Sequence, residues 1–302
     1  MDRAILLLIC AGVPMTIGMS REQCVQVFDT RMMGLEGFTG VCLIPGVEPV
    51  LVDAGTLAGS DALVDWLRSL NVIPACVVVT HAHHDHIGGL DAVMRAFEGV
   101  RVLASPLGAE RLLDPRTVNR HYTAEELVPV SGVQAVREGE EMDLAGLRLR
   151  FHLTPGHSAD SLSLHELSTD TLFVGDLPGD WLWGTTFLPP CATEDFDEVA
   201  YRQSMDRMMG LGARNLVLSH FGVFSGQDAA ALLPDLRLRH ERWKDVLLGA
   251  YATAKDASDV AVQIRELLSG SALETVPGWN EATEAFAAWC LMGYRHAGLL
   301  EG

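Results

Sequence analysis

Short apolar runs that end at a glycine or a turn residue recur along the first three-quarters of the chain. Runs of this kind, 3 to 10 residues long, are typical of strands in a sheet that is buried on one or both faces. By this pattern, strands are predicted at residues 24–28, 38–43, 50–53, 75–79, 101–104, three times within 144–176, and at 215–218. The first three are expected to form an antiparallel meander with a turn at Pro45-Gly46.

Segments with helical spacing of apolar residues lie between these strands. In residues 60–70 the side chains of Leu63, Trp66 and Leu67 recur on one face, and Ser60-Asp61 can cap the helix start. Further helices are predicted at residues 90–97, 107–113 and 196–209, whereas residues 114–135 are irregular and polar and predict a surface insertion. Strands and helices in this order predict an α/β (α+β) fold.

From about residue 234 the pattern changes to helices alone. Helix-like runs occupy residues 236–254, 258–268 and 280–297, and their aromatic stripes are typical of core packing. The chain is therefore predicted to have three parts, namely an N-terminal extension (1–21), a mixed α/β domain (22–233) and a C-terminal helical cap (234–302).

A run rich in metal-binding side chains follows the predicted strand at residues 75–79. It contains His81, His83, Asp85 and His86, with Gly88-Gly89 at its end. Imidazole and carboxylate ligands suit zinc, or iron or manganese. Packing four such side chains at a strand end would be costly without a metal or dense hydrogen bonding. The run therefore supplies about half of the ligands for two metal ions.

Four other predicted strands end at an aspartate or a histidine beside a glycine or a turn residue. These residues are Asp53, His157, Asp176 and His220. A neighbouring glycine permits close backbone approach and unusual φ/ψ angles. We expect the remaining metal ligands at these strand ends.

This ordered set resembles the metallo-β-lactamase-fold hydrolase superfamily, which includes glyoxalase II, lactonases, alkylsulfatases and nucleases. The resemblance covers roughly residues 22–225. It implies an αββα four-layer sandwich with the metals at one edge, between the two sheets. It also implies two divalent metal ions, with zinc expected and iron or manganese as alternatives.

The resemblance carries over to individual residues. It implies His81, His83 and His157 as ligands of a first metal, Asp85, His86 and His220 as ligands of a second, and Asp176 as the bridge between them, together with a water or hydroxide. Asp53 is expected to orient a ligand histidine, with a plain turn role as the alternative. The variable position His84 and the unmatched His121, His152, His165, His240 and His296 are expected to be surface or satisfied polar residues.

A dinuclear site of this kind implies hydrolysis by a metal-bridging hydroxide. Asp85 is then placed to orient the nucleophile and to pass a proton to the leaving group. A small ester, thioester or lactone is the expected substrate. The candidate pocket residues are Met32, Leu35, Phe38, Trp181 and Trp183, although the two tryptophans are equally compatible with packing beneath the C-terminal helices.

The charge of the chain bears on the alternative activities. Its 22 basic and 40 acidic residues give a formal net charge of −18, and no basic run is present. Nucleic-acid binding depends on Lys and Arg that neutralise phosphates, so no nucleic-acid partner is expected. A phosphodiesterase or nuclease on the same fold stays as the alternative, and it would require a cationic groove.

Two further alternatives are a binding protein that keeps the fold and a persulfide dioxygenase with mononuclear iron. The complete ligand set disfavours both, and His83 occupies the place of the glutamate found in flavo-diiron proteins. Arg237, Arg239, Arg242 and Lys244 match no glutathione-binding pattern of glyoxalase II. Glutathione thioesters are therefore not indicated as substrates.

The cysteines and the N-terminus suggest a location. None of the six cysteines forms a Cys-x-x-Cys motif, which favours reduced thiols and a cytoplasmic protein. The apolar residues 4–13 weakly resemble the core of a signal peptide, so export is the alternative, but they are too short to span a membrane. A small-molecule substrate is the expected partner, and the sequence leaves a monomer and a homodimer open.

Overall fold

The computed structural model describes residues 25–123, 125–254, 257–276 and 278–300, so the predicted extension at 1–21 lies outside the described residues. The chain divides into two compact units. We call the first the sandwich unit; it comprises the described residues up to Leu153, together with 160–175 and 213–226. We call the second the helical unit; it comprises residues 154–159, 176–212 and the described residues from 227 onward.

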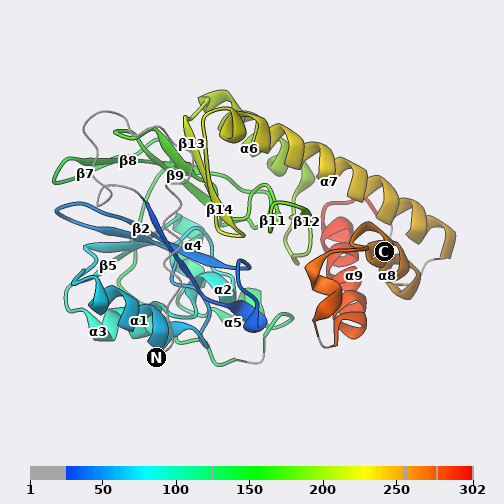
Figure 1. The fold of residues 1–302 in the computed structure, drawn as a ribbon, viewed down its shortest axis with the longest axis horizontal. Helices are drawn as coiled ribbons and strands as arrows, with labels where there is room; N and C mark the ends of the chain where they lie inside the picture. Colours follow the sequence, from blue (N-terminus) through cyan, green and yellow to red (C-terminus); the bar gives the residue numbers. More distant parts are fainter. Residues whose placement is uncertain (1–24, 124, 255–256, 277, 301–302) are drawn as a thin grey trace. The chain divides into compact units, whose positions relative to one another are not determined.

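The sandwich unit contains two six-stranded sheets, which face each other in Figure 1. In spatial order the first sheet consists of β1 (Gln26–Asp29), β2 (Gly40–Ile44), β3 (Val50–Val52), β4 (Cys76–Val78), β5 (Arg101–Ala104) and β6 (Gln134–Ala135). The second consists of β14 (Gly222–Ser225), β13 (Asn215–Leu218), β10 (Thr171–Phe173), β9 (Leu162–Glu166), β8 (Leu147–Leu153) and β7 (Glu141–Leu144).

Parallel pairing brings the chemically important strand ends to common edges. In the first sheet β3 and β4 are parallel, with Val52 opposite Val78. In the second sheet β10 and β13 are parallel, and β8 runs in the same direction because both β8 and β10 are antiparallel to β9. The segments that follow β8, β10 and β13 therefore all leave the second sheet at the same edge.

Two apolar cores hold the sandwich unit together. One lies between the sheets and joins residues such as Val50 and Val78 of the first sheet to Phe151 and Phe173 of the second. The other lies between the first sheet and the helices α1 (Ser60–Ser69) and α3 (Leu90–Ala96). Side chains alternate along a strand, so one sheet can supply both cores from its two faces. Short helices complete the unit, namely α2 (His84–Ile87), α4 (Pro106–Arg111) and α5 (Arg116–Asn119), with the 3-10 turn η2 (Met32–Gly34).

The helical unit is built from four long helices and one hairpin. They are α6 (Glu198–Leu211), α7 (Gln227–Ala254), α8 (Ala257–Leu267), α9 (Trp279–His296), the 3-10 turn η3 (Ala272–Thr275), and the hairpin of β11 (Asp180–Leu182) and β12 (Thr186–Leu188). No helix in the described part of the chain is long and apolar enough to cross a membrane.

Buried charge joins α6 to α7 within this unit. The Glu198 carboxylate accepts hydrogen bonds from His240 Nε2 at 3.0 Å and from Lys244 Nζ at 2.7 Å. Burial raises the pKa of the Glu198 carboxyl, but the bonds from His240 and Lys244 outweigh burial and bring this pKa to about 2. Glu198 is therefore ionised at neutral pH, and its charge is matched inside the core.

The α/β class and the opening antiparallel meander are confirmed. Three expectations were wrong in detail. Gly59, and not Ser60, stands at the N-cap of α1. Residues 114–135 are no plain surface insertion, because they form α5 and β6 and include the buried Asn119. The helix predicted from residue 236 begins at Gln227 and continues through Pro234, so the boundary predicted at 233/234 falls inside α7.

The glycine after α2 offers a test of this packing. A Cβ atom at Gly88 would lie 2.1 Å from the Leu57 amide nitrogen and 2.6 Å from the Thr56 carbonyl carbon, so the backbone must move. We expect Gly88→Ala to lower the free energy of unfolding by about 1–3 kcal/mol. Gly210→Ala is the matched control, because nothing lies within 4 Å of its Cβ position in α6. Helix propensity predicts that this control gains up to about 1 kcal/mol. Urea denaturation measures both, and equal stabilities would contradict the close approach at Gly88.

Candidate metal centre

The histidine-rich run forms the connection between β4 and α2. His81 and His83 lie in the extended segment after β4, and Asp85 and His86 lie in the single turn of α2. All four side chains are largely buried. An extended segment followed directly by a helical turn points several consecutive polar side chains to one place.

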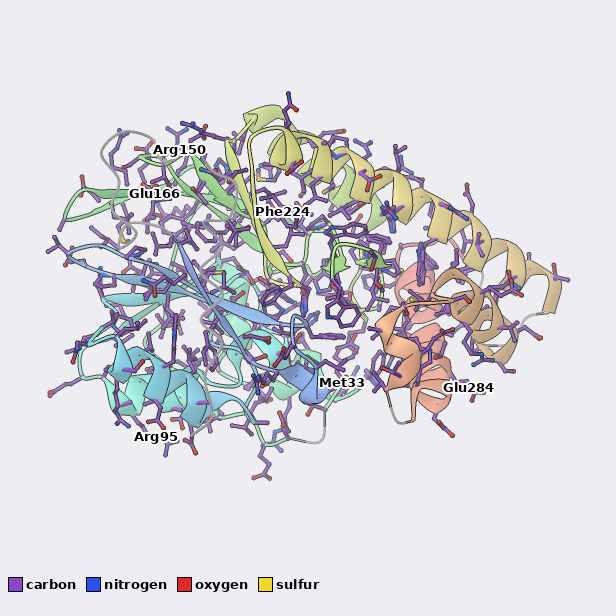
Figure 2. All side chains as sticks on the ribbon, in the orientation of Figure 1. Met33, Arg95, Arg150, Glu166, Phe224 and Glu284 are labelled. Atoms are coloured by element: carbon purple, nitrogen blue, oxygen red, sulfur yellow. The ribbon has the colours of Figure 1, made fainter. Side chains whose placement is uncertain are left out.

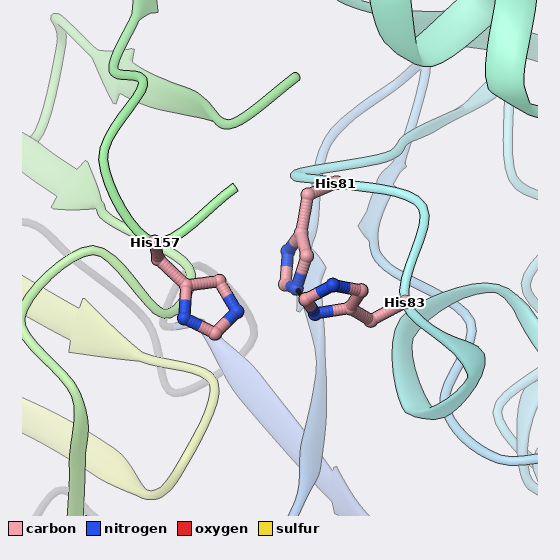
Figure 3. Close-up of side chains that lie close together, drawn as sticks. All are labelled: His81, His83 and His157. Carbon is pink, nitrogen blue, oxygen red and sulfur yellow. Dashed lines mark hydrogen bonds between the residues drawn. The ribbon is translucent and has the colours of Figure 1, made fainter. Parts of the chain in front are cut away.

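The ligand atoms of this run gather closely in the sandwich unit. Asp85 Oδ2 lies 3.2 Å from His220 Nε2 and 3.8 Å from His86 Nε2. Each of these three residues offers one ligand atom within 4.8 Å of the other two. His81 Nε2 lies 2.9 Å from His83 Nδ1. Figure 3 draws the His81 and His83 side chains together with that of His157.

In several of these imidazoles, Nδ1 makes a hydrogen bond that fixes the orientation of the ring. We call this the outer nitrogen, because Nε2 is the nitrogen that faces the other ligands. His220 Nδ1 donates to the Phe38 carbonyl oxygen at 2.8 Å, and His157 Nδ1 donates to the Pro190 carbonyl oxygen at 2.8 Å. A carbonyl oxygen can only accept, so Nδ1 carries the proton in both rings. Their Nε2 atoms therefore keep a lone pair for a metal ion.

Asp53 fixes the orientation of two further imidazoles, that of His86 directly and that of His81 through Thr80. Its carboxylate accepts hydrogen bonds from the Thr80 amide at 2.7 Å and the Thr80 hydroxyl at 2.9 Å, and lies 2.8 Å from His86 Nδ1. The Thr80 hydroxyl gives its one hydrogen to Asp53, so at its 3.1 Å contact with His81 Nδ1 it acts as acceptor. His81 and His86 are thus both oriented with Nε2 available.

The charge state of Asp85 follows from its neighbours. Burial by itself would raise the pKa of the Asp85 carboxyl. The nearby imidazoles of His86 and His220 outweigh burial and hold this pKa well below its usual range. Asp85 is therefore a carboxylate at neutral pH, which is the form that binds a cation.

The helical unit carries two more of the expected ligands. His157 follows β8 and Asp176 follows β10, and His157 Nε2 lies 3.7 Å from Asp176 Oδ2. The Thr193 hydroxyl donates to the His157 carbonyl oxygen at 2.6 Å. The segment Pro190 to Thr193 therefore holds His157 by both its ring and its backbone.

The donor set fits a divalent transition metal. It consists of buried imidazole nitrogens and carboxylate oxygens, and four rings, those of His81, His86, His157 and His220, have their outer nitrogen anchored by an oxygen. This is the arrangement of ligands and supporting residues found in metal sites. The chemistry of the set suits zinc, iron or manganese.

Three residues that sequence reasoning missed hold the histidine-rich run in place. The buried Asp160 accepts a hydrogen bond from the Ala82 amide at 2.9 Å and pairs with Arg111 at 2.5 Å. Asn119 of α5 accepts from the His84 amide at 2.7 Å and donates to the Ala82 carbonyl oxygen at 2.8 Å. Asp160 stands among small and polar residues, Ser158, Ala159 and Ser161, so no local pattern pointed to it or to Asn119.

A further acid stands near Asp176. Each of Asp176 and Asp180 offers one carboxylate oxygen within 4.8 Å of the other. Asp180 is the first residue of β11, and no local sequence pattern distinguished it as a candidate ligand.

The five candidate pocket residues differ in their surroundings. In the sandwich unit Phe38 is buried beside the His220 ring, whereas Met32 and Leu35 are partly exposed. Their neighbour Met33 is 60% exposed and projects from η2 in Figure 2. In the helical unit the Trp181 ring lies beneath the Arg239 guanidinium of α7, at 4.5 Å, and Trp183 is partly buried. The contact of Trp181 agrees with packing beneath the C-terminal helices.

Comparisons with known proteins give the family. A model described as the metallo-beta-lactamase superfamily matches residues 43–220. The chain is 27% identical over 232 residues to a metallo-beta-lactamase fold-containing protein of Sulfurisphaera tokodaii, covering 72% of this chain and 85% of that protein. It is 29% identical over 205 residues to an acyl-coenzyme A thioesterase of Gallus gallus, covering 59% of this chain and 70% of that protein. A metallo-beta-lactamase family protein from Thermus thermophilus has a TM-score of 0.60 at 24% identity, covering 86% of this chain and 89% of that one. The fold expected from the sequence is confirmed.

The Thr193 hydroxyl tests how His157 is held. Removing it by Thr193→Val keeps the volume but frees the His157 backbone, so we expect about tenfold weaker metal binding. Titration of the metal-free protein with Co²⁺, followed by visible absorption, measures this. Thr193→Ser should restore the affinity.

Thr283→Val is the matched control for that experiment. Thr283 is also buried in the helical unit and its hydroxyl donates to the Trp279 carbonyl oxygen at 2.6 Å, within α9. It should lose stability but bind Co²⁺ normally. Equal Co²⁺ affinities of Thr193→Val and the unmodified protein would show that this hydrogen bond does not position His157.

Proposed function

Because the chain belongs to the metallo-beta-lactamase superfamily, we propose that it is a metal-dependent hydrolase of a small acyl ester, thioester or lactone. The observation that carries this proposal is the buried cluster of Asp85, His86 and His220, with its anchored imidazoles and ionised carboxylate. All seven expected ligands lie within the residues that the family model matches.

We propose that these ligands bind two divalent metal ions, with zinc as the first choice. His81, His83 and His157 would hold one ion, Asp85, His86 and His220 the other, and Asp176 would contact both. The topology supports this assignment, because the segments after β8, β10 and β13 leave their sheet at one edge. The supporting role of Asp53 rests on its contacts with Thr80 and His86.

When bound, such ions lower the pKa of a coordinated water and polarise the acyl carbonyl. The residues of the chain supply orientation and proton transfer. Asp85, ionised and held between His86 and His220, accepts the proton of the attacking water and passes it to the leaving group.

Within this class a thioester is the substrate that we propose. The supporting fact is the likeness to an acyl-coenzyme A thioesterase. The net charge of −18 also favours acyl substrates over nucleic acids. We also propose a cytoplasmic setting, and the free, buried state of the four described cysteines, Cys42, Cys76, Cys191 and Cys290, supports it.

The decisive experiment combines metal titration with a substrate panel. Metal-free protein is titrated with Zn²⁺, Fe²⁺ and Mn²⁺ and assayed against acyl thioesters, aryl esters, lactones and bis-p-nitrophenyl phosphate. We expect activity to reach its maximum near two ions per chain, with thioesters cleaved at the highest kcat/KM. Full activity at one ion per chain would overturn the two-ion assignment. A better rate with the phosphodiester would support the alternative phosphodiesterase activity.

Asp85→Asn tests the proton relay. The substitution keeps the shape of the side chain but removes its charge and basicity, so kcat should fall by about two to four orders of magnitude. The metal content of the variant is measured alongside, because Asp85 is also a proposed ligand. Unchanged turnover at full metal occupancy would exclude the relay.

A further inference from the structure

A cleft in the helical unit contains none of the proposed metal ligands. It encloses about 460 Å³, within the range of small-molecule binding sites. Its walls come from α7, α8, the segment 269–271 and the β11–β12 hairpin. Every lining residue belongs to the helical unit, so the cleft is a feature of that unit alone.

Two arginines line the cleft, although the chain as a whole has a net charge of −18. Arg239 and Arg242 of α7 line the cleft, and Glu266 of α8 is the one acidic residue among the lining residues. Arg239 Nε donates a hydrogen bond to the Asp235 carboxylate at 2.7 Å, so the charge of Arg239 is already partly neutralised. Arg242 is exposed and has no ion pair or side-chain hydrogen bond with the residues that the structure describes. Arg242 is therefore available for an anionic ligand.

Polar and aromatic side chains also line this cleft. Gln263 and Thr185 line the cleft with an amide and a hydroxyl. Trp243 and Phe187 supply an aromatic wall.

This chemistry suits a phosphate joined to a less polar arm. A guanidinium group binds phosphate through paired, charge-assisted hydrogen bonds. A tetrahedral phosphate can accept hydrogen bonds from several directions, as the arginine, glutamine and threonine donors require. The aromatic wall provides contact for the attached arm.

The hairpin connects the cleft to the proposed reaction site. Asp180, at the start of β11, lies beside Asp176, and Thr186 pairs with Leu182 at the other end of the same short ladder. Two residues of strand span roughly 7 Å, and Thr186 lines the cleft. A substrate that reaches both places needs an extended arm between its acyl group and its phosphate.

We propose that the cleft binds the phosphate at the end of the thiol arm of a thioester substrate. The proposal rests on the proposed thioester hydrolysis and specifies the substrate class as phosphate-bearing thioesters. The arm could belong to a free thiol cofactor or to a carrier protein. The shared chemistry is a phosphorylated, extended thiol.

The experiment compares two probes that differ only in the phosphate, acetyl-pantetheine and acetyl-4′-phosphopantetheine. With the metal-loaded protein, KM should be about tenfold lower for the phosphorylated probe, the size expected for one charge-assisted contact. Arg242→Ala should abolish this difference. Glu266→Gln should increase it two- to threefold by removing the opposing charge. Raising the salt concentration should reduce it.

Arg237→Ala is the matched control. Arg237 lies on the same helix but pairs with Asp206 of α6, and it does not line the cleft. It should keep the full difference between the probes. Equal KM values for the two probes in the unmodified protein, or an equal loss with Arg237→Ala and Arg242→Ala, would overturn the proposal.

A binding measurement separates this proposal from the proposed function. Calorimetric titration of the metal-loaded protein with 4′-phosphopantetheine needs no turnover. Saturable binding that Arg242→Ala weakens about tenfold would support the cleft even if no thioester were cleaved. Absence of binding would overturn the cleft even if thioesters were cleaved. A comparison of acetyl-coenzyme A with an acetylated carrier protein then identifies the source of the arm.

Discussion

The buried carboxylate of Asp53 connects the parts of the sandwich unit on which the proposed chemistry depends. It follows β3, bonds to Thr80 at the end of β4, to His86 in α2, and to the Ser219 hydroxyl after β13 at 3.3 Å. A buried charge is tolerated only when such partners surround it. Asp53 also has a left-handed backbone with φ of 62°, which is unfavourable for a residue with a side chain. The buried charge and the left-handed backbone both cost free energy. The hydrogen bonds of Asp53 offset this cost, and they fix the ends of two sheets and the His86 imidazole to one another.

Much of this arrangement could be predicted from the sequence because its signals are local. The buried strands β3, β4, β10 and β13 appear as short apolar runs, and each ends where an Asp or a His follows. The dense run from His81 to His86 identifies the candidate metal centre without any knowledge of distant contacts. The hairpin β11–β12 also had a local signal that was overlooked. Its turn has positive φ at Trp183 and Gly184, and glycine favours such a conformation.

The rest could not be predicted, because it depends on contacts between distant parts of the chain. Asp160 reaches Ala82 across 78 residues, and Asn119 reaches it across 37. Nothing beside Asn119 distinguishes it from a polar loop residue until the fold buries it.

The start of α7 illustrates a competing effect. Proline usually ends a helix, but Leu232, Leu233 and Leu236 are buried around Pro234, so packing outweighs the lost hydrogen bond.

The C-terminal helices do more than cover a surface of the helical unit. A Cβ atom at Gly293 of α9 would lie 2.0 Å from the Cys191 carbonyl oxygen and 2.9 Å from that of Thr193. Only glycine permits this approach, so α9 packs directly on the segment that supplies both hydrogen bonds to His157. The position of α9 and the orientation of His157 are therefore set by the same few residues. A change in the packing of α9 would be transmitted to His157 through Pro190 and Thr193, although α9 itself contains none of the proposed ligands.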